Sequence, residues 1–229
     1  MTLESAAGWE LLDDPLAPAH QVHESLRHIA RANRLFGGAA AVRWGLREAL
    51  AGVPRGTTLS LLDVGTGLGD LPRMARDWAQ RFGVRLLPFG LDRHPAAARL
   101  AATGGLATIV GSGDALPLRT RSVDLVLMSQ VAHHFCPSAV VCLLRECDRV
   151  ARQAVVVADL RRSRAAAFGF RLASRLLGFD EDTRRDGVTS LDRGYSVQSF
   201  GQLLGEAGVA AQVARRPGAR LVAVWTPVS

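Results

Sequence analysis

Hydrophobic and polar positions follow two different periods along the chain. Near the start, apolar residues recur three and four positions apart over residues 18–35 and 39–51, which predicts two amphipathic helices. Glycines at 37–38 end the first helix, and Gly52 with Pro54 ends the second. From residue 59 onward the pattern changes to short apolar runs separated by helical segments. The two helices therefore precede a part of the chain with a different architecture.

The short apolar runs have the length and composition of buried strands. They cover residues 59–64, 85–91, 106–110, 123–128, 154–158, 209–214 and 221–225. Pro88 shortens the second run, because proline removes a donor from the hydrogen-bond ladder. Helical segments lie between the runs: after the first strand, from Pro95, and over residues 137–150, 163–177 and 197–207. Strands that alternate with helices of this length predict a parallel sheet with right-handed crossovers.

The C-terminal third departs from this alternation. Residues 178–195 are polar, charged and irregular, and a loop of that length is typical of a lid or a binding segment. The last two strands are joined through residues 216–218, which form a turn signal, so they predict a hairpin. The expected fold is therefore α/β, with a seven-stranded sheet that is parallel except for one antiparallel strand and has helices on both faces.

A glycine-rich turn joins the first strand to the helix after it. Residues 63–70 read DVGTGLGD and lie at the carboxyl end of the sheet, where open α/β sheets bind ligands. The glycines let the backbone turn tightly and approach a ligand. A dinucleotide-binding turn would carry glycine or alanine where Asp70 stands. Asp63 ends the strand, and a buried carboxylate there would repel a phosphate and accept an ammonium group.

This turn resembles the first motif of class I methyltransferases that use S-adenosylmethionine, and the resemblance extends over most of residues 59–160. In that family an acid after the second strand holds the ribose, and a further acid after the third strand reaches the adenine. Asp92 and Asp114 stand at those places, and residues 122–126 match the start of the family's fourth strand. The resemblance implies a Rossmann-like fold and S-adenosyl-L-methionine as the cofactor, with S-adenosyl-L-homocysteine as the product. The residues that it implies for cofactor binding are Asp63, Gly65, Thr66, Gly67, Gly69, Asp92, Arg93, Gly113, Asp114, Ala115, Ser129 and Arg34.

The segment after the fourth strand, residues 129–135 (SQVAHHF), would face the methyl group of the cofactor. It lacks the Asn/Asp-Pro-Pro-aromatic motif of enzymes that modify bases, and it resembles small-molecule methyltransferases, including the quinone-type group. Residues 33–38 resemble the segment ahead of the cofactor domain in quinone-type enzymes. Residues 159–163, 186–187 and 193–196 resemble bacterial methyltransferases of phenolic polyketide and lipid biosynthesis. The implied acceptor is a small phenolic or quinol-like molecule of secondary metabolism. Oxygen is the expected site of methylation, with carbon as the alternative.

A phenolic acceptor has to lose a proton, and its pKa is about 10 when nothing perturbs it. Histidine is the side chain best suited to accept that proton near neutral pH, so His133 and His134 are the candidate bases. The alternative for either histidine is a packed, hydrogen-bonded structural role. No metal is expected.

Other side chains allow two interpretations each. Arg34 could meet the cofactor carboxylate or lie on a solvated helix face, and Tyr195 could line the acceptor pocket or act as a buried anchor. His94 is placed beside the adenine. The remaining histidines of the first helix, His20, His23 and His28, are expected at the surface.

Composition and charge change this picture little. Hydrophobic residues make up 48% of the 229 residues and charged residues 21%, so the chain can bury an ordinary core without disulfides. The net charge is +7, and all 28 basic residues are arginine, which indicates a bias in base composition. Charge alone therefore does not predict nucleic acid as a partner. An RNA methyltransferase and a non-catalytic S-adenosylmethionine-binding module remain the alternatives, and an oxidoreductase using NAD comes last, since a Tyr-x-x-x-Lys pair needs lysine.

The remaining expectations concern location and organisation. No apolar run approaches the roughly 18–20 residues of a membrane span, and residues 1–5 do not begin a signal peptide. The odd number of cysteines, three, favours reduced thiols in a cytoplasmic protein. We expect one methyltransferase domain over residues 55–229 with a lid insertion at about 160–196, and a helical extension over residues 1–54 that forms part of the substrate cap.

Overall fold

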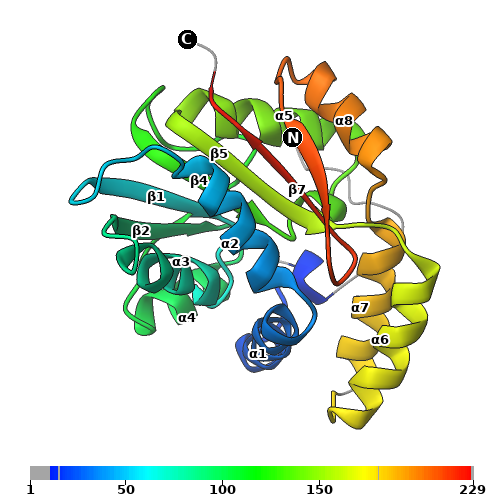
Figure 1. Ribbon diagram of the computed structural model, residues 1–229. Coiled ribbons are helices and arrows are strands. Elements are labelled where there is room, and N and C mark those ends of the chain that lie inside the picture. Colours follow the sequence, from blue (N-terminus) through cyan, green and yellow to red (C-terminus); the bar gives the residue numbers. More distant parts are fainter. Residues whose placement is uncertain (1–10, 15, 180, 228–229) are drawn as a thin grey trace.

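Seven strands form one sheet through the centre of the molecule (Figure 1). The structure, a computed structural model, describes residues 11–14, 16–179 and 181–227. The strands are β1 (Thr58–Val64), β2 (Arg85–Asp92), β3 (Ala107–Val110), β4 (Val123–Ser129), β5 (Ala151–Leu160), β6 (Gln212–Arg216) and β7 (Arg220–Trp225). Their order is β3-β2-β1-β4-β5-β7-β6, and β7 pairs antiparallel with both β5 and β6 while the other pairs are parallel. The prediction of a mostly parallel sheet with one antiparallel strand is confirmed.

The helices cover both faces of this sheet. Those of the described residues are α1 (Ala19–Leu35), α2 (Gly38–Ala49), α3 (Asp70–Gln80), α4 (Pro95–Thr103), α5 (Pro137–Val150), α6 (Arg164–Leu176), α7 (Glu181–Arg193) and α8 (Val197–Glu206), with short 3-10 helices η1 (Leu11–Asp13) and η2 (Ala132–His134). The fold is Rossmann-like, and the sequence predicted both the strands and most of the helices.

Two apolar layers hold the helices against the sheet. On one face, Val42 and Leu46 of α2 and Ala75 of α3 are fully buried with Leu61 and Leu125 of the central strands. On the other face, a second cluster joins α5 and α8 to the opposite side of the same strands. β1 and β4 consist of nearly continuous apolar runs because both of their faces are buried.

The first helix packs away from the sheet, on the helix that follows β2. Val22 and Leu26 of α1 are buried against Ala96 and Ala97 of α4 in a separate small cluster. This contact brings α1 to the carboxyl edge of the sheet, where β1, β2 and β4 end. The helical extension is thereby placed next to the glycine-rich turn.

Strand β2 is longer than the sequence predicted. Pro88 was expected to shorten it, but the strand runs through Arg85–Asp92 and Pro88 is paired in register with Leu61 of β1. On its other side β2 pairs with β3 only over Phe89–Asp92, so it has no second neighbour at Pro88. A strand edge is the place where a sheet tolerates proline.

The prediction of an irregular segment over residues 178–195 is wrong. Most of it forms α7, which lies side by side with α6 and together with it projects away from the sheet (Figure 1). Gly187 in the middle of α7 weakens the helical signal, since glycine disfavours helices. The structure explains this glycine, because a Cβ atom there would lie 2.3 Å from Cε1 of Phe170 on α6. Tertiary packing therefore requires glycine at this position of the helix.

Candidate functional site

A cavity of about 440 Å³ lies at the carboxyl ends of β1, β2 and β4. Its volume falls within the roughly 300–1,000 Å³ of small-molecule sites. One wall consists of the segments that follow these three strands, represented by Gly65, Arg93 and Gln130. The opposite wall comes from the helical extension and the α6–α7 hairpin, which contribute Ile29 and Phe170 among others. The two parts of the chain predicted to cap the site thus both line the cavity.

The glycine-rich turn has the backbone geometry that its sequence predicted. Gly65, Gly67 and Gly69 have φ angles of 73°, 54° and 72°, in the left-handed region that favours glycine. At Gly65 a Cβ atom would also lie 2.4 Å from Cγ2 of Val131, so a side chain would push away the segment after β4. The Gly67 N–H donates to Oδ2 of Asp92 over 2.9 Å. The acid at the end of β2 therefore holds the turn in place.

Three carboxyl groups lie close together around this turn. Burial raises the pKa of Asp63 to about 8, against a hydrogen bond of 2.8 Å from the Thr66 hydroxyl, and the charges of Asp70 and Asp92 raise it further. Burial also raises the pKa of Asp70 and of Asp92. For Asp92, the N–H groups of His94 and Gly67 partly oppose that rise. Carboxyl groups with raised pKa values favour a ligand that brings positive charge.

Most residues predicted for the site line the cavity. They are Asp63, Gly65, Thr66, Gly67, Asp92, Arg93, Gly113, Ser129, His133 and His134.

Four predicted residues, Gly69, Asp114, Ala115 and Arg34, do not line the cavity. Gly69 is buried at the N-cap of α3, and Asp114 accepts a hydrogen bond from the Ser112 hydroxyl. Ala115 and Arg34 are exposed, so the structure favours the interpretation of Arg34 as part of a solvated helix face. Contacts of these four residues with a cofactor stay predictions.

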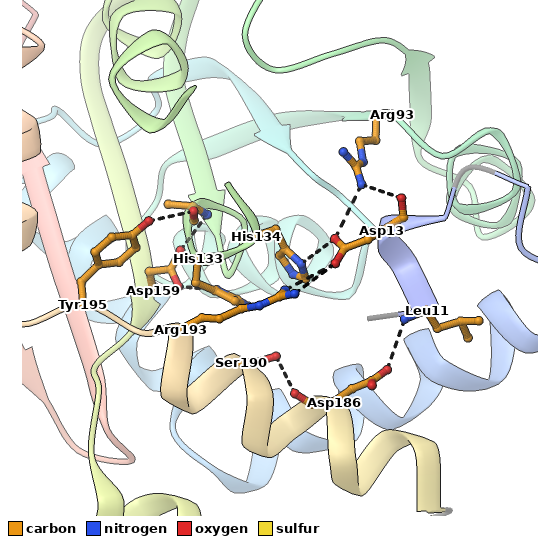
Figure 2. A network of polar contacts seen from close by, with 11 residues as sticks. Leu11, Asp13, Arg93, His133, His134, Asp159, Asp186, Ser190, Arg193 and Tyr195 are labelled. Atoms are coloured by element: carbon orange, nitrogen blue, oxygen red, sulfur yellow. Dashed lines mark hydrogen bonds and ion pairs between the residues drawn. The ribbon is translucent and has the colours of Figure 1, made fainter. Parts of the chain in front are cut away.

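His133 forms a buried pair with an acid at the end of β5. Its Nδ1 lies 2.6 Å from Oδ1 of Asp159, and the two side chains are 3% and 0% exposed (Figure 2). Burial alone would raise the pKa of Asp159. The charge and hydrogen bond of His133 outweigh this effect, together with a hydrogen bond from the Leu160 N–H, so the pKa of Asp159 lies below its usual value. With Nδ1 bound to a carboxylate, Nε2 is the nitrogen that His133 can offer to a ligand in the cavity.

His134 points instead toward the beginning of the chain. Its Nδ1 lies 3.1 Å from Oδ1 of Asp13 in η1. The same carboxylate meets the guanidinium groups of Arg193 at the end of α7 and Arg93 after β2, as Figure 2 shows. Asp13 thus joins three distant elements beside the cavity. Sequence reasoning missed Asp13 and Arg193, because nothing local marks either as a site residue.

A second polar group was also missed. The Gln130 side-chain amide donates to Oδ1 of Asn33, and a hydrogen bond from Asn33 lowers the pKa of Asp70 against the effect of burial. All three residues line the cavity. Asn33 shares the otherwise apolar face of the helix over residues 18–35, and a buried polar residue on such a face was the available signal.

The structure also places His28, His94 and Tyr195, about which the sequence made individual predictions. His28 is not a surface residue: it lines the cavity, stacks on Phe179 and has its Nδ1 2.9 Å from the Thr183 hydroxyl. His94 does not line the cavity, and its Nδ1 instead caps α4 by accepting from the Ala96 N–H. Tyr195 is an anchor, because its hydroxyl donates to the Ala132 carbonyl and the residue lies outside the cavity lining.

A comparison with protein families identifies the central part of the chain. Residues 62–158 match the family described as Methyltransferase domain. Over this stretch, which is less than half of the chain, the protein is similar to that family. The match includes the glycine-rich turn, Asp92 and His133, and it ends at residue 158, so Asp159 and the α6–α7 hairpin lie outside it. No curated protein matches the chain.

Solved structures share the fold of this chain, including the helices that flank the matched stretch. An S-adenosylmethionine-dependent methyltransferase from Aquifex aeolicus is 19% identical with a TM-score of 0.61, over 92% of this chain and 99% of that one. A protein of Nostoc punctiforme assigned as an O-methyltransferase is 20% identical with a TM-score of 0.61, over 97% of this chain and 64% of that one. Magnesium protoporphyrin IX methyltransferase from Synechocystis, solved with S-adenosylhomocysteine, is 12% identical with a TM-score of 0.53, over 97% and 90% of the two chains. The fold is that of S-adenosylmethionine-dependent methyltransferases.

No helix of the described residues combines the length and hydrophobicity that crossing a membrane requires. Nor do the described histidine, cysteine, aspartate and glutamate side chains form a group of three that could hold a metal ion.

Proposed function

We propose that this methyltransferase transfers a methyl group from S-adenosylmethionine to an oxygen of a small phenolic or quinol-like acceptor, with His133 as the base. The observation that carries the proposal is the buried His133–Asp159 pair, which opens on the same cavity as the glycine-rich turn. A carbon acceptor is the alternative within the same site.

The residues around the turn fit this cofactor. S-adenosylmethionine carries a sulfonium and an ammonium group. The carboxyl groups of the buried Asp63 and Asp92 and of the half-buried Asp70 all have raised pKa values. A cation bound among them would lower those pKa values and return the carboxylates to their charged form. The left-handed glycines leave the turn free of side chains on the path of the ligand. Asp63 is the residue that we expect to respond most, since its pKa is raised to about 8.

The His133–Asp159 pair can prepare an oxygen for attack. The ionised Asp159 holds the proton on Nδ1, which leaves a lone pair on Nε2. Nε2 accepts the proton of the acceptor hydroxyl, and the oxygen lone pair forms the new bond to the methyl carbon. A bound S-adenosylmethionine would supply this methyl group from its sulfonium and would keep the electron pair of the broken carbon–sulfur bond, which gives the neutral thioether S-adenosylhomocysteine. The protein supplies alignment, exclusion of water and a base.

The far wall of the cavity supports an aromatic acceptor. Phe36 and Phe170 meet edge to face with ring centroids 5.4 Å apart, and Phe170 meets Phe179 at 6.3 Å. All three rings line the cavity together with Ile29 and Leu191. Apolar and aromatic walls with a few polar groups are typical of sites for small organic ligands. A charged polymer such as RNA would find few partners on this wall.

The direct test is methyl transfer to defined acceptors. The purified protein is incubated with methyl-labelled S-adenosylmethionine and, separately, with phenols, catechols, hydroquinones, small amines and total RNA. We expect label in aryl methyl ethers. Label in RNA, or binding of the cofactor without transfer to any acceptor in the panel, would overturn the proposal.

Variants of the histidines test the assigned base. His133→Asn keeps a donor for Asp159 but has no basic nitrogen, so we expect kcat to fall on the order of 100-fold or more with unchanged cofactor affinity. His134→Asn should raise KM more than it lowers kcat, because His134 contacts Asp13 of the capping segment. His23→Asn, on the exposed side of α1, is the matched control. Equal losses of kcat in the first two variants would contradict the assignment of His133 as the base.

A further inference from the structure

Helix α6 exposes a row of large apolar side chains. Phe168, Leu172 and Leu176 are 72%, 57% and 83% exposed. They are four positions apart, so they share one side of the helix. Large exposed apolar patches mark a surface that binds something else. The row is separate from the site described above, because none of the three residues lines the cavity.

A row of arginines runs beside the apolar row. At about 100° per residue, Arg164, Arg171 and Arg175 fall within about 60° of Phe168 on the side away from Leu172 and Leu176. All three arginines are exposed, and the sequence of α6, RAAAFGFRLASRL, contains no acidic residue. Among the described residues, no ion pair involves these three guanidinium groups. The surface of α6 is thus both apolar and strongly basic.

The opposite side of α6 is already occupied. Ala167 and Phe170 pack in a cluster with Val188 and Leu191 of α7, and Ser174 is fully buried. The α6–α7 pair projects away from the sheet, with α6 on the outer side of the pair (Figure 1). The helix is therefore held by its inner side while its apolar and basic side stays accessible.

We propose that α6 binds the surface of an anionic lipid bilayer. An apolar row beside basic residues is the pattern of a helix that lies in the membrane interface, where apolar side chains enter the boundary of the acyl chains and cations meet lipid phosphates. Charge favours this occupant over a second copy of the chain. Two copies that pack α6 antiparallel through this face about a two-fold axis would bring their arginine rows to the same side, whereas an anionic bilayer complements them.

This placement has a consequence for the cavity. Phe170 and Gly169 of the same helix line it, so a bilayer on the outer side of α6 would lie about one helix diameter, roughly 10 Å, from the apolar wall. Membrane binding itself does not depend on the proposed acceptor, and it is measured without any acceptor or turnover.

The test is co-sedimentation of the full chain with vesicles. Phosphatidylcholine vesicles are compared with vesicles that mix phosphatidylglycerol into phosphatidylcholine. We expect binding to the anionic vesicles only, weakened by added salt. Each of Arg164→Gln, Arg171→Gln and Arg175→Gln should lower the partition coefficient about fivefold. The triple variant Phe168→Ser, Leu172→Ser, Leu176→Ser should abolish binding, and all these positions are exposed, so the fold should persist.

Matched controls separate this surface from general charge and hydrophobicity. Arg47→Gln and Arg99→Gln remove exposed arginines from α2 and α4, and Phe82→Ser and Leu87→Ser remove exposed apolar side chains after α3 and in β2. These variants should bind vesicles like the wild type. Equal losses in the controls, or no binding of the wild type to anionic vesicles, would overturn the proposal. So would a dimer in analytical ultracentrifugation that the triple serine variant dissociates, because it would assign the face to a second copy.

Discussion

The Asp13 carboxylate and the Arg193 guanidinium form an ion pair across 180 residues of sequence, with Nη1 3.4 Å from Oδ2 and each side chain 4% exposed. The pair joins the beginning of the described chain to the last turn of α7. His134 meets the same carboxylate from the segment after β4. One acid therefore couples the capping segments to the edge of the sheet that carries the site.

Removing the charge of Asp13 should loosen the cap. We expect Asp13→Asn to cost about 3–5 kcal/mol of local stability, since removing one charge of a buried ion pair takes away the attraction that offsets the burial of the other. Hydrogen exchange should become faster in α7 and in η1 and stay unchanged in α5. Asp14→Asn is the matched control, because the Asp14 carboxylate contacts only the neighbouring Leu16 N–H in the described hydrogen bonds. Unchanged exchange in α7 would show that this ion pair does not hold the cap.

The stability of the ligand-free protein should depend on pH through Asp63. Its pKa is raised to about 8 in the folded chain and is about 3.9 when unfolded, so between these values the folded state binds more protons. The free energy of unfolding should then fall as the pH rises from about 4 to about 8, by at most about 1.4 kcal/mol per pH unit. Urea denaturation across this range measures the slope, and Asp63→Asn should reduce it. An unchanged slope in the variant would exclude Asp63 as the source.

Local features of the sequence predicted one half of the site. The glycine-rich turn and Asp92 lie within a continuous motif, and the strands around them are apolar runs whose period is visible without the fold. The turn and its acid do meet, through the Gly67 N–H and Oδ2 of Asp92. The sequence motif predicts this contact correctly because β1 and β2 are adjacent parallel strands, so the residues that follow β1 and those that end β2 lie at the same edge of the sheet.

The other half depends on contacts between distant segments. Asp159 lies 26 positions from His133, and Asn33 lies 97 positions from Gln130. No period or motif predicts which side chains such segments bring together. Residues 178–195 were predicted to be irregular from their polar and charged composition, but most of them form α7, which packs on Phe170 of α6 at Gly187. Tertiary packing outweighed local propensity at this place.

The role of Asp159 as a positioning residue should show in the dependence of the rate on the acceptor. Asp159→Asn keeps an oxygen for the Ala132 N–H but no longer stabilises a protonated His133. We expect kcat for an ordinary phenol to fall on the order of 100-fold. 2,4-Dinitrophenol, already ionised at neutral pH, should react with the variant at nearly the wild-type rate because it needs no base. Asp148→Asn, outside the cavity, is the control, and an equal loss with both acceptors would contradict the role in proton transfer.

The pKa of Asp159 adds an independent check on the same variant. Because its pKa is lower in the folded chain than in the unfolded chain, Asp159 contributes stability above about pH 3.9, and that contribution is lost as the pH falls through the folded value. The difference in unfolding free energy between the wild type and Asp159→Asn should therefore shrink in acid. Denaturation curves at neutral and acidic pH measure it. A difference that stays constant with pH would mean that the charge of Asp159 does not stabilise the fold.

Gly187 gives a prediction in which packing opposes helix propensity. Alanine is the better helix former by about 1 kcal/mol, yet its Cβ would lie 2.3 Å from Cε1 of Phe170, a ring that is held between Phe36 and Phe179. We expect Gly187→Ala to destabilise the protein by about 1–3 kcal/mol, as overpacking does. Gly201→Ala in α8 is the matched control, since nothing lies within 4 Å of its added Cβ, and it should stabilise by about 0.5–1 kcal/mol. Thermal and urea unfolding of both variants measure whether each substitution lowers or raises the free energy of unfolding. If both substitutions stabilised the protein, the contact between α6 and α7 at Phe170 would be looser than the structure shows.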